Sequence, residues 1–218
     1  MRVDEDQDIK IVTSEAKFVI DVYSYPELAG AADYVCVGEV VEELETTNAL
    51  SEEQVKALEE MDKPDNELSE EERKALEEVE GKGNSNMYFS PQSHYMVQVK
   101  ENLKGELDQS KPIRIDKTGG FMPDGKSCEL FENDILPSVG EEYVFFIWAQ
   151  EDGSNRVSGP NSNIPLNPDD MGRASTMTDG VRTTDREAVL EKVRDAVNNQ
   201  VSPPEPIKFD QSNDDVGK

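Results

Sequence analysis

Residues Ala32–Val41, ADYVCVGEVV, have the pattern of a half-buried β-strand. Successive side chains of a strand point to opposite sides of the sheet. One side of the stretch carries no charge and consists of Ala32, Tyr34, Cys36, Gly38 and Val40; the opposite side consists of Asp33, Val35, Val37 and Glu39. A glycine inside a strand is typical of a bend or bulge, which a closed barrel needs at its corners. The stretch is predicted to be the first strand of a small β-barrel with its uncharged side inward; a strand of another kind of sheet is the alternative.

The composition predicts a modest core with long polar additions. Of the 218 residues, 35% are hydrophobic and 32% are charged, and the net charge is −26. Such acidity repels phosphates, which argues against nucleic acid and anionic membrane surfaces, and it is compatible with a cation or a basic partner. No segment reaches the roughly 18 to 20 apolar residues that a membrane span requires.

The chain opens with the polar run MRVDEDQD and without a basic and apolar signal segment. This start is expected of an exported protein whose signal or anchor has been removed, with cytoplasmic origin as the alternative. Cys36 and Cys128 are the only cysteines. An exported protein could join them in a disulfide, but the default expectation is a buried thiol at Cys36 and an exposed thiol at Cys128.

Residues 1–15 are expected to form an acidic tail, followed by a short strand at Lys17–Val22. Ser24 has the features of a helix N-cap, with Pro26 and Glu27 in the first turn. Residues 16–200 are interpreted as one domain.

An acidic insertion is predicted at 42–87, between the first two main strands. Its residues 42–82 include 16 acidic and 5 basic residues, a net charge of −11. The segment LSEEQVKALEEM (50–61) recurs 18 residues later as LSEEERKALEEV (68–79), with nine of twelve positions identical. Each copy begins with a serine cap and glutamates, which predicts two short helices with thin apolar faces. The insertion is interpreted as either a solvated hairpin loop or a docking arm for a protein partner.

Strand patterns return after the insertion. Tyr95, Val97 and Val99 share one face of the predicted strand 88–100, and Ile113 and Ile115 alternate with polar residues before Gly119-Gly120. Glu142–Ala149, EYVFFIWA, is apolar on both faces and is predicted to be a central strand covered on both sides. Residues 157–160 are a candidate closing strand.

A helix is predicted at 184–200, where Thr184 and Glu187 form a capping box. Its apolar stripe, expected to dock on the barrel, consists of Val189, Leu190, Val193, Ala196 and Val197. Prolines end the helix, and residues 201–218 are expected to be a disordered acidic tail.

The ordered segments ADYVCVGEVVEEL, YMVQVKENLKGEL, PIRIDKTGG and VGEEYVFFIWA resemble the netrin-like domain of tissue inhibitors of metalloproteinases and of their bacterial exported relatives. The resemblance covers about residues 30–165 and rests on Ala32, Asp33, Gly38, Val40, Val99, Lys104, Gly105, Gly119, Gly120, Gly140, Tyr143 and Phe146. It implies a mainly β fold with added helices (α+β): a five-stranded OB-type barrel with a helical insertion and a C-terminal helix packed on it. It also implies an extracellular or lipid-anchored setting.

The departures from the family concern its inhibitory mechanism. The animal inhibitors bind the protease zinc through a mature N-terminal cysteine, whereas no cysteine precedes Cys36 here. No inhibitory residue is therefore carried over.

No catalytic, metal-binding or cofactor-binding residue is predicted. His94 is the only histidine and the only candidate base for a triad, but Ser90 and Ser93 are too close in sequence to serve it as nucleophile. The segment Asp62–Arg73 fails as an EF-hand, because Glu67 and Arg73 stand where glycine and glutamate are needed. The sequence favours a monomeric, non-enzymatic interaction module at the cell surface; a protease inhibitor acting through a loop is the alternative, and an enzyme using carboxylates and calcium is a weaker one.

Overall fold

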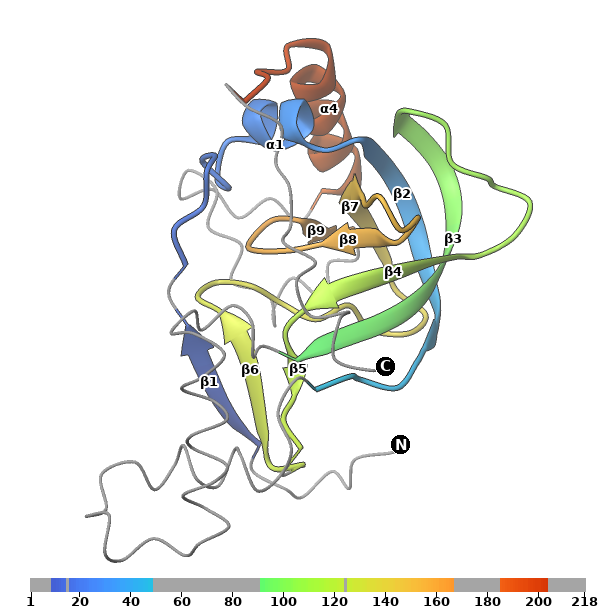
Figure 1. The fold of residues 1–218 in the computed structure, drawn as a ribbon. Coiled ribbons are helices and arrows are strands. Elements are labelled where there is room, and N and C mark those ends of the chain that lie inside the picture. Colours follow the sequence, from blue (N-terminus) through green and yellow to red (C-terminus); the bar gives the residue numbers. More distant parts are fainter. Residues whose placement is uncertain (1–8, 15, 49–90, 124, 167–184, 204–218) are drawn as a thin grey trace, which may run out of the picture.

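A five-stranded β-barrel with two helices against one side dominates the computed structural model (Figure 1). The structure describes residues 9–14, 16–48, 91–123, 125–166 and 185–203. In chain order the elements are β1 (Lys10–Ser14), α1 (Tyr25–Ala31), β2 (Tyr34–Glu43), β3 (Gln92–Lys104), β4 (Ile113–Thr118), β5 (Gly120–Phe121), β6 (Ser127–Phe131), β7 (Glu142–Ala149), β8 (Asn155–Val157), β9 (Asn163–Pro165) and α4 (Arg186–Asn198).

The barrel strands follow the order β2-β3-β4-β8-β7, and pairing of β2 with β7 closes the ring. Only the β4–β8 pair within this ring is parallel. Strand β2 bends as it pairs with both neighbours, and its register with β3 shifts at three places. One shift is at Gly38, where a Cβ would collide with the Val97 side chain, so the bend requires glycine.

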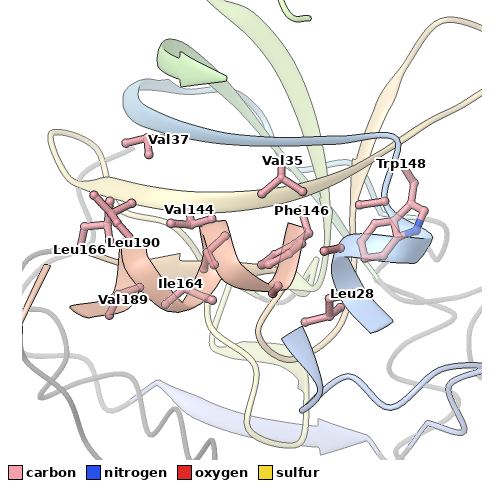
Figure 2. Packing of buried hydrophobic residues seen from close by; sticks show 14 residues of the cluster. Leu28, Val35, Val37, Val144, Phe146, Trp148, Ile164, Leu166, Val189 and Leu190 are labelled. Carbon is pink, nitrogen blue, oxygen red and sulfur yellow. The ribbon is translucent and has the colours of Figure 1, made fainter. Parts of the chain in front are cut away.

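Two hydrophobic clusters lie on opposite sides of the barrel wall. The cluster inside the barrel contains Cys36 and Val40, which were predicted to point inward, together with Tyr95, Val97, Val99, Ile115, Tyr143, Phe145 and Ile147. The cluster outside it lies between β2, β7 and the two helices, and Figure 2 shows Val144 and Phe146 against α4. The sequence prediction that β7 is covered on both faces is confirmed.

The outer cluster corrects one expectation about β2. Val35 and Val37, assigned to the side opposite the core, are 0% and 1% exposed. They are buried because α1 and α4 cover this face (Figure 2), so β2 is buried on both sides from Val35 to Gly38. The apolar stripe of α4 docks as predicted, with Val189, Leu190 and Val193 in the cluster. The N-cap of α4 is Asp185, whose carboxylate accepts the Glu187 N–H at 3.0 Å.

Three expectations about local structure are wrong, two of them because of a small second sheet, ordered β1-β6-β5. Residues 10–14, assigned to a tail, form β1 and pair in parallel with β6. The strand expected at 17–22 is absent; the Asp21 carboxylate instead accepts the Tyr23 N–H, and Ser24 N–H donates to Asp21 O, which makes a turn into α1. Cys128 was expected to be exposed but lies on β6 between two strands and is 4% exposed.

Both cysteines are free and buried. Burial raises the pKa of the Cys36 thiol to about 12 and that of the Cys128 thiol to about 11, so both are unreactive near neutral pH. The predicted repeat helices at 50–61 and 68–79 lie outside the described residues, as does the predicted tail from residue 204 on. The first residues of that tail are described, and Val201 N–H donates to Pro26 O at 2.9 Å. The N-cap of α4 is Asp185 rather than the predicted Thr184. In the described ranges, no helix has the length and apolarity needed to cross a membrane.

Candidate functional site on the outer face of β3 and β4

A cluster of polar side chains lies on the outside of the barrel, where the ends of the 42–87 insertion reach β3. On β3, alternation puts Tyr95 and Val97 inside and His94 outside. On β4, Ile115 faces inward and Asp116 outward. His94 and Asp116 stand directly opposite each other in the antiparallel pair. They form the centre of what we call the outer polar cluster, together with Thr47, Gln92 and Arg114.

Asp116 accepts two hydrogen bonds within this cluster. His94 Nδ1 lies 2.6 Å from Asp116 Oδ1, and Arg114 Nε donates to the same oxygen at 2.8 Å. Burial alone would raise the pKa of the Asp116 carboxyl, but the hydrogen bonds from His94 and Arg114 and the nearby guanidinium charge outweigh it and hold the pKa below its usual value. Asp116 is therefore a carboxylate at neutral pH, and because a carboxylate only accepts, we assign the proton between them to His94 Nδ1. Arg114 Nη2 lies 3.0 Å from the same nitrogen, and with this tautomer the two atoms are in contact without a hydrogen bond.

The other ring nitrogen of His94 points to the start of the insertion. His94 Nε2 lies 2.9 Å from Thr47 Oγ1. Thr47 and Gln92 also exchange both backbone hydrogen bonds, at 2.9 and 2.8 Å, and Leu44 N–H donates to His94 O at 2.8 Å. The two chain ends that lead into and out of residues 49–90 are thus joined to each other and to β3. The outer polar cluster fixes the root of the insertion on the barrel.

The order of Thr47, His94 and Asp116 is that of a hydroxyl, an imidazole and a carboxylate in a hydrolase triad. A triad also needs donors for the oxyanion, commonly including the backbone N–H of the nucleophile. Here the Thr47 N–H already donates to Gln92 O, in the pair of backbone hydrogen bonds that joins Thr47 to Gln92. Ser93 serves a different bond, since its hydroxyl donates to Gly119 O at 2.8 Å, and Ser90 lies outside the described residues. The cluster is best explained as an anchor.

Sequence reasoning singled out His94 but missed its partners. Thr47 is 47 residues from His94 along the chain, and nothing local marks it as a neighbour. Asp116 had a usable signal, because it and Arg114 alternate with Ile113 and Ile115 on a predicted strand. Predicting that Asp116 contacts His94 would also have required knowing the register in which β3 pairs with β4.

The residues that carry the family resemblance build the fold. Asp33 accepts the Ala149 N–H at 2.8 Å, which ties the start of β2 to the end of β7. Lys104 Nζ donates to Ala29 O and Ala32 O at 2.7 and 2.6 Å, so it caps the carbonyl end of α1. The Lys104-Gly105 pair is completed by Gly105, whose φ of +70° favours glycine and where a Cβ would approach the Tyr34 ring.

Comparison with known proteins adds no family to this description. No protein-family model and no curated protein matches the chain. Within the part of the chain that the structure describes, no group of three or more His, Cys, Asp or Glu side chains could hold a metal ion.

Proposed function

We propose that the protein is a non-enzymatic interaction module that presents its 42–87 insertion to a protein partner. One observation carries the proposal: the ends of the insertion are joined by the Thr47–Gln92 bridge and held on β3 through His94 and Asp116. A loop pinned at its root loses less conformational freedom on binding than a free one, which favours affinity.

The barrel is further proposed to be of the OB type and similar to netrin-like domains. In support, its first strand, β2, pairs with both the second and the fourth strand, while the third and fifth strands, β4 and β8, run parallel. This is the Greek-key order of an OB barrel. Ligands of such barrels commonly contact the second and third strands, which here are β3 and β4, and the loop between the first and second, which here is the insertion.

The charge of the insertion defines the partner that we propose. With 16 acidic and 5 basic residues over 42–82, it fits a protein with a basic surface rather than nucleic acid. We propose that a monomer acts outside the cell or at its surface, as the resemblance to exported proteins suggests. Lysine and arginine groups on the partner would pair with the glutamates of the two repeats.

Photo-crosslinking in the producing cells tests this proposal. A photoreactive residue at Glu60 or Glu78 should capture a discrete protein. The same residue at Lys111, in the connection between β3 and β4 and with 74% side-chain exposure, should not. Replacing the glutamates of both repeats with glutamine at constant length should abolish capture. Capture from Lys111 alone, capture unchanged by the glutamine variant, or no capture from any position would exclude the insertion as the docking segment.

A protease inhibitor acting through a loop is the alternative function. The clamped root favours it, because loop inhibitors need a loop held in one shape. Residual activity of a panel of metalloproteases and serine proteases, measured with an excess of the protein, tests it. Full activity of every enzyme would remove this alternative and leave the interaction module.

A further inference from the structure

Lys117 and Asp134 form an ion pair sealed inside the protein. Lys117 follows Ile113 and Ile115 on the inward side of β4, and Asp134 lies just beyond β6. Nζ of Lys117 lies 2.7 and 2.8 Å from the two carboxyl oxygens, and the side chains are 0% and 1% exposed. The amine is therefore in contact with the carboxyl group, with no bulk water around either.

The groups around this pair match the parts of an acyl-transfer site. Ile135 N–H donates to Asp134 Oδ1 at 2.8 Å, where it would stabilise charge developing on that oxygen. Ser162 Oγ lies 2.9 Å from Lys117 Nζ and can carry a proton away from it. Gly159 O accepts from Ser162 Oγ and fixes the hydroxyl. Nucleophile, electrophile, oxyanion donor and proton carrier thus occupy one dry site.

Burial also favours the neutral forms that the reaction needs. Loss of solvation lowers the pKa of the Lys117 amine and raises the pKa of the Asp134 carboxyl, against the attraction between the two charges. Transfer of a proton from the ammonium to the carboxylate therefore costs less here than in water. Lys100 and Glu39 are a matched contrast, because their charged atoms are also 2.7 Å apart but their side chains are 43% and 35% exposed. Water keeps that pair charged and unreactive.

We propose that Lys117 and Asp134 join in an intramolecular isopeptide bond, formed by the folded protein without any added reagent. The inference goes beyond the proposed binding function and rests on different residues. It assigns a covalent modification site to the barrel interior.

The step balances as a dehydration. Lys117 Nζ–H₃⁺ passes one proton to the Asp134 carboxylate, and the carboxyl group turns about Cβ–Cγ to present its face to the amine. The nitrogen lone pair attacks Cγ while Ile135 N–H holds the oxyanion. Ser162 Oγ takes a proton from nitrogen and delivers one to the departing hydroxyl, so the Cγ–O bond breaks and one water leaves. Effective concentrations of reactants held in contact this way are very high, which replaces chemical activation.

The bond would close a covalent ring of residues 117–134. This ring includes the end of β4 and all of β5 and β6. The cross-link would keep the end of β4 joined to the segment that follows β6 even in denaturant. A protein working outside the cell would gain resistance to unfolding and proteolysis.

Intact-mass spectrometry of the denatured full-length protein tests the proposal directly. We expect the mass to be lower than the sequence mass by one water molecule. Trypsin cannot cleave after an acylated lysine, so the digest should contain peptide 115–126 joined to peptide 127–156. Because the measurement is made on the denatured wild type, it does not depend on the folding of any variant.

Two controls separate the cross-link from other losses of water. Lys117→Met should show its full sequence mass, whereas Lys100→Met, which removes the exposed pair, should keep the loss. Succinimides at Asp124-Gly125 or Asp152-Gly153 also lack one water, but they reopen in mild alkali and leave no branched peptide. A wild type at full mass, or a water loss mapped only to an Asp-Gly site, would overturn the proposal.

Discussion

Asp116 and Lys117 are neighbours on β4, yet they belong to two different electrostatic environments. Asp116 points outward and shares its charge with His94 and with Arg114, whose side chain is 55% exposed. Lys117 points inward, and the one charged group that its amine contacts is Asp134, which is 1% exposed. The alternation of a single strand separates the two sites.

This comparison shows that partners alone do not determine what an ion pair does. The outer cluster borders solvent, and its Thr47 hydroxyl can accept or donate, so the His94–Thr47 hydrogen bond can form in either direction. The inner pair has no such freedom, because each charge is satisfied only by the other and by a few fixed groups. The outer site is suited to anchoring a loop, and the inner site to locking the barrel.

Breaking the inner pair should have the largest effect on stability. Lys117→Met leaves the Asp134 carboxylate buried without its cation, and loss of one partner of a buried pair typically costs about 3–5 kcal/mol. Urea unfolding followed by circular dichroism measures it. Lys117→Met with Asp134→Leu removes both charges, so it should recover the part of the loss that comes from the unpaired carboxylate but not the part that comes from the proposed cross-link. A single variant as stable as wild type would show that the pair contributes little.

Breaking the outer cluster should have an intermediate effect. Asp116→Ala leaves His94 and Arg114 without their shared acceptor, which should lower the free energy of unfolding by about 1–3 kcal/mol. Asp116→Asn, the matched control, keeps an acceptor oxygen and should lose less. Amide hydrogen exchange should also accelerate at Thr47 and Gln92, whose mutual bonds the cluster supports. Unchanged exchange at these two residues would show that the outer polar cluster does not support the Thr47–Gln92 hydrogen bonds.

The pH dependence of the outer cluster has a definite sign. The folded pKa of Asp116 lies below the ordinary value of 3.8, so its contribution to stability is present above that value and is lost as pH falls through the folded pKa. The stability gap between wild type and Asp116→Asn should therefore be full at pH 7 and shrink below about pH 4. Urea midpoints at several pH values measure it, and a gap that widens in acid would contradict the assigned sign.

How far the sequence could predict each site follows from how local its determinants are. Alternation within β3 is a local property, and it correctly grouped Tyr95, Val97 and Val99 on one face, which lies inside the barrel. The same rule puts Lys117 on the side of Ile115, so a buried lysine could have been predicted. Its partner could not be predicted, because Asp134 follows β6, and the many turn-forming residues around that strand obscure its pattern.

The wrong expectations share one physical cause, which is burial imposed by distant segments. Val35 and Val37 alternate with uncharged residues and share their face with Asp33 and Glu39, which predicted an outward face. The helix that covers them, α4, lies about 150 residues away in the chain. Residues 10–14 were predicted to be a tail, since the strand that they pair with, β6, lies more than 100 residues later in the chain. Neither contact leaves a periodic signal within its own stretch.

The exposed Lys100–Glu39 pair should show the smallest effect, and it sharpens the comparison because its 2.7 Å distance equals that of the inner pair. Glu39 raises the pKa of the Lys100 amine by hydrogen bonding to its charged form. Water and salt nevertheless screen an exposed pair, and holding two flexible side chains in place costs entropy. Lys100→Ala should leave the urea midpoint almost unchanged, and 0.5 M salt should remove what difference remains. A loss comparable to that of Lys117→Met would mean that distance, rather than burial, sets the strength of these pairs.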